Sequence, residues 1–154
     1  MKGKPEIIDK LNFLLADELT AINQYFVHAE ECGDWGFEAL HHSIEKRSID
    51  EMKHAEDLIA RILFLEGTPV VDKLNRMHIS DTVPGMLEND RQAETDAISN
   101  YNEAIKLAAE LLDNGTKELL DSILKDEEAH LDYIESQLEQ IEQMGLEQYL
   151  TTVK

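Results

Sequence analysis

The sequence contains little of what builds disulfide-rich, β-sheet or membrane-spanning proteins. Its 154 residues include one cysteine, three prolines and seven glycines. The single cysteine, Cys32, excludes an internal disulfide framework and the zinc sites that need paired cysteines. No apolar run approaches the roughly 18 residues that cross a bilayer, and the stretch MKGKPEIIDK has no apolar signal core. We therefore expect a cytoplasmic protein with no membrane as partner.

Positive charge is scarce as well. Fourteen Lys and Arg residues stand against 33 Asp and Glu residues, which gives a net charge of −19. Nucleic acid would be repelled and is not expected as a partner, whereas metal cations are compatible with this charge. The common residues Ala, Leu, Glu and Ile favour long helices. The length suits one core, so we expect a single all-α domain over residues 1–154.

Four long helical patterns and a short fifth follow Pro5, which tolerates a first-turn position. The expected helices run from Pro5 to the stretch CGDWG, from about Trp35 to Leu65, from SDTVPGML to DNGT, from there to Gly145, and over LEQYLTTVK. Gly33 is expected to cap the first helix and Asp34 to begin the second. The aperiodic residues 66–82 are long for a turn, so they should cross the bundle and leave the second and third helices parallel.

Each of the four apolar stripes is interrupted by one carboxylate. In two helices, at EMKH and EEAH, a histidine follows three residues later, and residues three apart share a helix face. These six positions are Glu18, Glu51, His54, Glu94, Glu127 and His130. Counting residues from each expected turn gives the height of each carboxylate along the bundle. Glu18 and Glu51 should lie at the same height, whereas Glu94 and the EEAH pair should differ by about one helical turn.

Four buried carboxylates are intolerable without compensating positive charge. The stripes offer only Arg47 and Arg91, too few to neutralise them, whereas two metal cations would do so. Mixed oxygen and imidazole ligands suit iron or manganese. One Glu from each of two helices, with Glu-x-x-His from the other two, is the arrangement of di-iron carboxylate bundles. We therefore predict a two-metal centre, with two of the carboxylates bridging.

The positions of other side chains along the helices give further expectations. Tyr25 and Tyr101 lie on the same faces, either as hydrogen-bond donors to the carboxylates or as core packing. Lys46 and Asp50 are expected to form a solvated pair away from the metal stripe. The remaining histidines lack the ligand spacing and are expected on the surface or in loops: His28, His41, His42 and His78.

The chain resembles the bacterioferritins over its full length. The resemblance rests on LLADELTAINQYFVHAEECGDWG, SIDEMKHAEDLIARILFLEGTP, EEAHLDYIESQLEQI and GLEQYL. It implies a ferritin-like four-helix bundle with a long crossover and a short fifth helix. It also implies a di-iron ferroxidase centre in which Glu51 and Glu127 bridge two iron ions, within a hollow 24-subunit shell that stores ferric mineral.

The resemblance also gives Met52 a role. Met52 lies 100° around the helix from Glu51, so it should leave the core and face a neighbouring subunit. The family implies haem b between two subunits, with one Met52 from each as axial ligand. The family further implies a [2Fe-2S] ferredoxin that supplies electrons for iron release. Some members carry a histidine at the position of Lys46, which with Asp50 can bind iron on the cavity side; this chain departs from them there.

The sequence therefore predicts an iron-storage ferroxidase that oxidises Fe²⁺ with O₂ or H₂O₂. One alternative is another di-iron enzyme of the same bundle, such as a rubrerythrin-like peroxidase, although the single cysteine argues against a rubredoxin domain. A second alternative is a haem-binding electron-transfer or structural dimer. It would leave iron oxidation insensitive to Glu18→Ala and Glu94→Ala.

Overall fold

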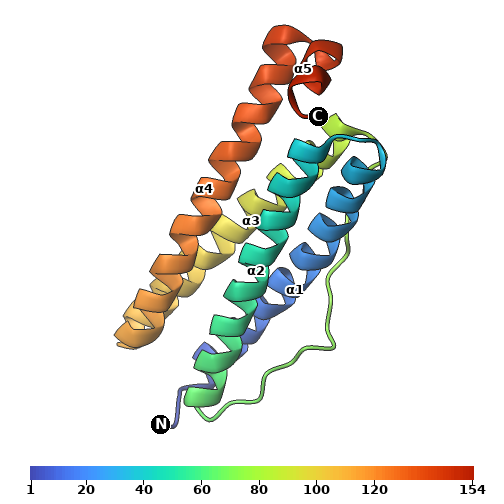
Figure 1. Ribbon diagram of the computed structural model, residues 1–154. Helices are drawn as coiled ribbons and strands as arrows, with labels where there is room; N and C mark the ends of the chain where they lie inside the picture. The colour runs from blue at the N-terminus through green and yellow to red at the C-terminus, as the bar shows by residue number, and fades with distance from the viewer.

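The computed structural model describes residues 1–154 and contains five helices and no strand. Four long helices form the bundle, and a short one folds across its end (Figure 1). The helices are α1 (Pro5–Asp34), α2 (Glu38–Phe64), α3 (Val83–Glu110), α4 (Asn114–Met144) and α5 (Leu146–Thr152). The ferritin-like fold class predicted from the sequence is confirmed. No helix in the chain has both the length and the apolar character that a bilayer span requires.

Local chemistry explains where the helices begin. Pro5 lies in the first turn of α1, where its missing N–H costs nothing. The Thr82 hydroxyl accepts a hydrogen bond from the Gly85 N–H and caps α3, and Asp113 caps α4 by accepting from the Thr116 N–H. Between α4 and α5, Gly145 adopts φ 82° and ψ 153°, a conformation that is essentially restricted to glycine.

The turn between α1 and α2 differs from the prediction. α1 continues through Gly33 to Asp34, and α2 begins at Glu38 rather than near Trp35. The residue with positive φ is Gly36, at 84°, so the caps predicted at Gly33 and Asp34 are wrong. Gly33 instead allows close approach of α2, because a Cβ there would lie 3.1 Å from His41 Nδ1.

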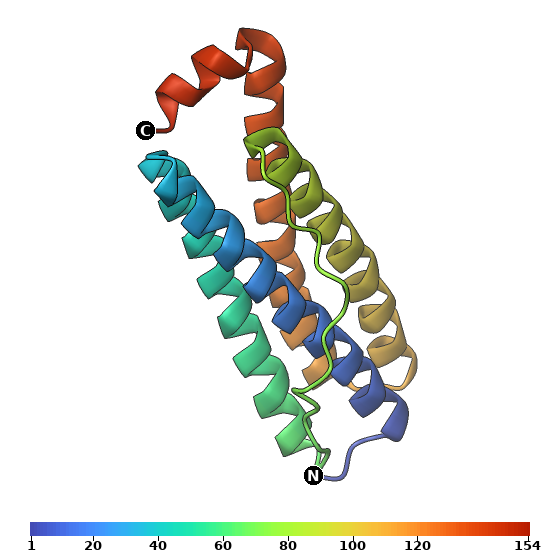
Figure 2. The ribbon, with the colours of Figure 1, turned by 90° about the vertical axis from the view of Figure 1, so that its right-hand side faces the viewer.

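Residues 66–82 run the length of the bundle outside α1 and α3, so α2 and α3 are parallel as predicted (Figures 1 and 2). A polar stripe on α1 holds this crossover. Four backbone N–H groups of the crossover donate to side chains of α1. The pairs are Val70 with Asn12, Asn75 with Thr20, His78 with Gln24, and Ser80 with His28. His28 is therefore buried as the last of these acceptors, and its predicted surface position is wrong.

Two apolar clusters fill the two ends of the bundle. One includes Leu11, Leu58 and Leu120, and the other includes Leu40, Leu87 and Ile134. α5 closes the second end, where the Tyr149 hydroxyl donates to Gln137 Oε1 at 2.7 Å. The level between these two clusters is occupied by polar side chains, which form the candidate site.

Arg91 was predicted on the inner stripe of α3, and this prediction is wrong. Arg91 is on the surface and pairs with Glu88, while its neighbour Asp90 is buried. Leu112 is 82% exposed and lies in the α3–α4 turn with φ 59°. Both 3- and 4-residue steps keep a side chain on one helix face, so periodicity alone cannot choose between adjacent positions.

Candidate metal centre

The six side chains predicted as ligands converge at mid-height of the bundle. The four carboxylates come one from each long helix, and all are buried. His54 is buried with them, and His130 is nearly so. The one-turn mismatch expected for Glu94 is absent because the α3–α4 turn is centred on Leu112. Glu94 precedes that residue by 18 positions and His130 follows it by 18.

The ligand atoms form two groups that share two carboxylates. One group contains Glu18, Glu51, His54 and Glu127, and the other contains Glu51, Glu94, Glu127 and His130. Within each group the atoms lie within 4.8 Å of one another. Glu51 and Glu127 belong to both groups, so each can reach two ions at once.

The two histidines cross the bundle toward carboxylates of the facing helix. His54 Nδ1 on α2 lies 3.0 Å from Glu127 Oε1 on α4. His130 Nδ1 on α4 lies 2.9 Å from Glu51 Oε1 on α2. Their Nδ1 atoms therefore face the cluster, and their Nε2 atoms face away from it.

Two further carboxylates hold the outward nitrogens. His54 Nε2 lies 2.9 Å from Asp126 Oδ2, and His130 Nε2 lies 3.1 Å from Asp50 Oδ2. A carboxylate on the outer nitrogen fixes the ring orientation of a metal-binding histidine. Asp126 was missed by sequence reasoning, and the placement of Asp50 away from the site is wrong. Asp50 does pair with Lys46, at 3.1 Å, as expected.

Two tyrosines donate to the outer carboxylates. The Tyr25 hydroxyl donates to Glu94 Oε1 at 2.8 Å, and the Tyr101 hydroxyl donates to Glu18 Oε1 at 2.5 Å. Both tyrosines also belong to the apolar clusters, so each packs in the core and orients a carboxylate. Burial and the neighbouring carboxylates raise the pKa of both phenols, so they remain donors at neutral pH.

The electrostatics of the cluster favour added positive charge. Burial, reinforced by Glu18 and Glu94, raises the pKa of Glu51 well above its ordinary value of 4.5. Burial, reinforced by the other carboxylates, does the same to the pKa of Glu127. Burial alone would lower the pKa of His54, but contacts with Glu127, Glu18 and Glu51 outweigh it and raise the pKa. Protons thus stabilise the carboxylates where metal cations would do so more strongly.

No arginine neutralises the cluster. The buried Arg47 guanidinium donates to Asp90 Oδ2 at 3.1 Å and stacks over the Tyr25 ring. Several buried ligand atoms make no well-aligned hydrogen bond, although some of them lie within ion-pair distance of a neighbour: Glu18 Oε2, Glu51 Oε1, Glu94 Oε2, Glu127 Oε1 and His130 Nδ1. Buried polar atoms without such a bond are costly, so their concentration at one point fits a site built for cations.

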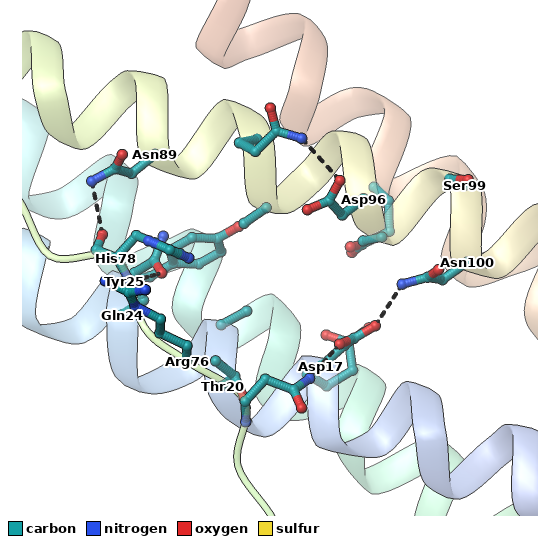
Figure 3. A pocket seen from close by; sticks show the side chains of 17 residues that line it. Asp17, Thr20, Gln24, Tyr25, Arg76, His78, Asn89, Asp96, Ser99 and Asn100 are labelled. Atoms are coloured by element: carbon teal, nitrogen blue, oxygen red, sulfur yellow. Dashed lines mark hydrogen bonds between the residues drawn. The ribbon is translucent and has the colours of Figure 1, made fainter.

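A cavity of about 540 Å³ leads to one side of the cluster. It lies between α1 and α3, beside crossover residues Asn75 and His78, and its lining includes Glu18 and Glu127. Asp17 on α1 and Asp96 on α3 face it from opposite sides (Figure 3). Most of the lining is polar, so the cavity suits a hydrated ion better than an apolar ligand.

Met52 lies outside this centre. Its side chain is 46% exposed, although the adjacent Glu51 is 1% exposed. Ile49, one turn earlier on the same face, is exposed too. The Ser48 hydroxyl donates to the Ile22 carbonyl, which places this part of α2 against α1.

Comparison with known proteins matches this architecture. The ferritin-like domain model matches residues 8–144. A bacterioferritin of Brucella melitensis is 40% identical over 149 residues, 97% of this chain and 92% of its own length. Bacterioferritins of Mycolicibacterium paratuberculosis and Streptomyces coelicolor are each 41% identical, over 97% and 99% of this chain and 94% and 92% of their own lengths.

The chain belongs to the bacterioferritin family. The resemblance inferred from the motifs is therefore confirmed, and membership supports iron storage as the general role. The candidate centre and Met52 both lie inside the matched region.

Proposed function

We propose that this bacterioferritin oxidises Fe²⁺ at the mid-bundle cluster and stores the ferric product in an oligomeric shell. The observation that carries the proposal is the pair of ligand groups that share Glu51 and Glu127. Each group offers three carboxylates and one imidazole, the oxygen-rich mixture that suits iron. In this proposal residues 1–154 form one di-iron domain.

Charge balance supports two substrate ions. Four carboxylates carry four negative charges, and two Fe²⁺ ions carry four positive charges. Binding of Fe²⁺ would displace protons held by the carboxylates and by His54, because metal and proton compete for the same lone pairs. Glu18 with His54 and Glu94 with His130 would be the terminal ligands, and Glu51 and Glu127 would bridge.

The paired arrangement also suits the electron count. Two Fe²⁺ ions that become Fe³⁺ release two electrons. Together with two protons, this number of electrons reduces O₂ to H₂O₂, or H₂O₂ to two waters. The protein contributes position and charge: anionic oxygens stabilise Fe³⁺ more than Fe²⁺, and Asp126 and Asp50 hold the imidazoles in place. Fe²⁺ would reach the cluster through the polar cavity between α1 and α3.

The position of Met52 is compatible with the haem-ligand role that the family resemblance implies. An exposed thioether beside an exposed isoleucine suits an interface between subunits. A two-fold axis would bring Met52 of both subunits together, and their two soft thioethers would hold the haem iron. Bound haem supplies one-electron transfer. We propose that a [2Fe-2S] ferredoxin supplies the electrons that would reduce stored iron for release, in a 24-subunit shell in the cytoplasm.

The experiment compares Glu127→Gln with the matched control Glu128→Gln. Burial raises the pKa of Glu127, so a neutral glutamine should be accepted by the fold. Because Glu127 belongs to both ligand groups, the initial rate of Fe²⁺ oxidation in Glu127→Gln should fall by about tenfold to hundredfold. The rate is followed by ferric absorbance. Glu128 is an exposed neighbour outside both groups, and its variant should match the wild type. Equal rates in the two variants would contradict the proposal.

A further inference from the structure

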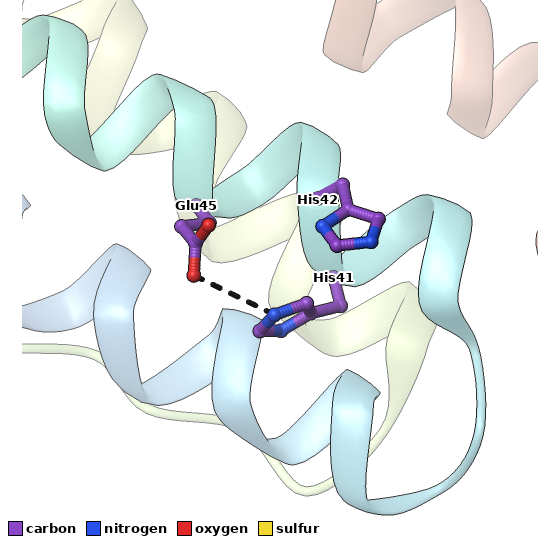
Figure 4. Close-up of side chains that lie close together, drawn as sticks. All are labelled: His41, His42 and Glu45. Carbon is purple, nitrogen blue, oxygen red and sulfur yellow. Dashed lines mark ion pairs between the residues drawn. The ribbon is translucent and has the colours of Figure 1, made fainter.

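A second group of metal-binding side chains lies on α2, far from the mid-bundle cluster. His41, His42 and Glu45 each place one ligand atom within 4.8 Å of the others (Figure 4). His41 precedes Glu51 by ten residues, about 15 Å along the helix axis. The group therefore cannot share an ion with the cluster, and it plays no part in the function proposed above.

His41 is held in the orientation that a metal ligand needs. Its Nδ1 lies 2.7 Å from the Ala29 carbonyl, which can only accept, so Nδ1 carries a proton and donates. In the neutral ring the Nε2 lone pair is then free and points away from α1. A backbone carbonyl on one ring nitrogen is a common way of fixing the tautomer and direction of a metal-binding histidine.

The free nitrogen faces a carboxylate. His41 Nε2 lies 3.5 Å from Glu45 Oε2, one turn along the same helix (Figure 4). A lone pair opposite a carboxylate oxygen is unfavourable unless a proton or a metal ion lies between them. His42 is 71% exposed and so can rotate toward the same point, while its Nε2 is only loosely placed, 3.9 Å from Glu38.

We propose that His41, His42 and Glu45 bind one divalent metal ion of the borderline class, with Zn²⁺ as the representative. Two imidazoles and one carboxylate form a known zinc ligand set with an open coordination position. Water would fill that position, and all three ligands reach solvent to some degree, so the ion would exchange readily. The site would thus hold an ion that is separate from any ion in the buried mid-bundle cluster.

The close packing of α1 supports this arrangement. A Cβ at Gly33 would lie 3.1 Å from His41 Nδ1, closer than side chains normally pack. Glycine at position 33 therefore keeps room for the ring that donates to Ala29. Gly33→Ala changes no ligand, but it should displace the His41 ring and weaken Zn²⁺ binding.

The test measures Zn²⁺ binding by the full chain in equilibrium dialysis. Glu45→Gln removes a ligand, and its matched control Glu38→Gln removes the same charge near His42 without removing a ligand of the group. The free Zn²⁺ concentration is set so that the wild-type site is half occupied, which is one ion per two chains. At this concentration Glu45→Gln should lose nearly all of that bound ion, because its affinity should be roughly tenfold lower or more. Glu38→Gln should stay within about twofold of the wild type. Gly33→Ala should fall in between.

Anomalous diffraction at the zinc edge then locates the ion. A peak within about 2.0–2.2 Å of ligand atoms of His41, His42 and Glu45 supports the site. Zinc density at the mid-bundle cluster but none at His41 would overturn it, and would leave the proposed function intact. Equal loss in Glu45→Gln and Glu38→Gln would also overturn it, since charge rather than coordination would then explain the binding.

Discussion

Glu51 and Met52 are neighbours in sequence and have opposite environments. Glu51 accepts contacts from both histidines in the centre of the bundle, while Met52 reaches the surface. The 100° rotation per residue in a helix is enough to separate them. One turn of α2 can therefore serve a metal centre on its inner side and a subunit contact on its outer side.

The role proposed for Met52 predicts a selective loss. Met52→Leu keeps an apolar side chain of similar size but removes the sulfur, so haem bound per subunit should fall strongly while the assembly stays intact. The measurements are the haem absorbance band and the size-exclusion profile after growth with added haem precursor. Fe²⁺ oxidation should be unchanged, because Met52 lies outside both ligand groups. Full haem occupancy in the variant would show that Met52 is not the ligand.

At the residue scale, sequence reasoning found the inward side chains and missed those around them. The six cluster residues interrupt apolar stripes, and a buried charge without a partner is costly enough to be noticed. Asp126 gave no such signal, because it is mostly exposed and lies next to Glu127. It contacts the cluster only through His54, which is a tertiary contact that helix periodicity does not contain.

At the element scale, one buried network joins three helices to the crossover. Asp90 on α3 lies 2.9 Å from His28 Nδ1 on α1 and 3.1 Å from Arg47 Nη1 on α2. His28 Nε2 accepts from the Ser80 N–H of the crossover, so its Nδ1 donates to Asp90. Through Arg47 the network also touches Tyr25, which donates to Glu94. The crossover and the candidate metal centre are thus connected by packed polar contacts.

This network predicts an acid-dependent loss of stability. Burial alone would raise the pKa of Asp90, but Arg47 and His28 outweigh it and lower the pKa below 3.8. A lowered folded pKa contributes stability above the unfolded value, and that contribution is lost as pH falls below about 4. Asp90→Asn leaves Arg47 buried without its carboxylate, so the free energy of unfolding should fall by about 3 kcal/mol at neutral pH.

Guanidinium unfolding at several pH values checks this prediction. The difference between wild type and Asp90→Asn should be constant from about pH 5 to pH 7 and shrink below about pH 4. Asp132→Asn, at an exposed position of α4, serves as the control and should lie within about 0.5 kcal/mol of the wild type. A difference that grows in acid would mean that the carboxylate of Asp90 is not stabilised by Arg47 and His28.

The helices themselves were predictable, but this network was not. The bounds of the helices agree to within a few residues with those expected from apolar periodicity and from the positions of Pro5, Pro84 and Gly145. His28 and Asp90 become buried only because the crossover and Arg47 come to meet them. Helical spacing is compatible with either Asp90 or Arg91 on the inner face of α3. Spacing alone does not show that Asp90 finds buried partners while Arg91 pairs with Glu88 on the surface.

At the scale of the whole molecule, the bundle separates apolar ends from a polar middle. Each apolar cluster is built from several helices, and together they hold the mid-bundle carboxylates in fixed positions. The net charge of −19 adds a field that attracts cations toward the chain. Neither property of a single chain specifies a shell or a haem. Those expectations came from family resemblance alone, because subunit contacts depend on a partner surface.

The most direct test of the account is anomalous diffraction at the iron edge, from crystals loaded anaerobically with Fe²⁺. Two peaks per chain are predicted at the mid-bundle level, roughly 3.5–4 Å apart. One should lie within bonding distance of Glu18 and His54, the other of Glu94 and His130, and both should contact Glu51 and Glu127. Iron found only at surface positions, or a single ion between the helices, would contradict the two-ion centre.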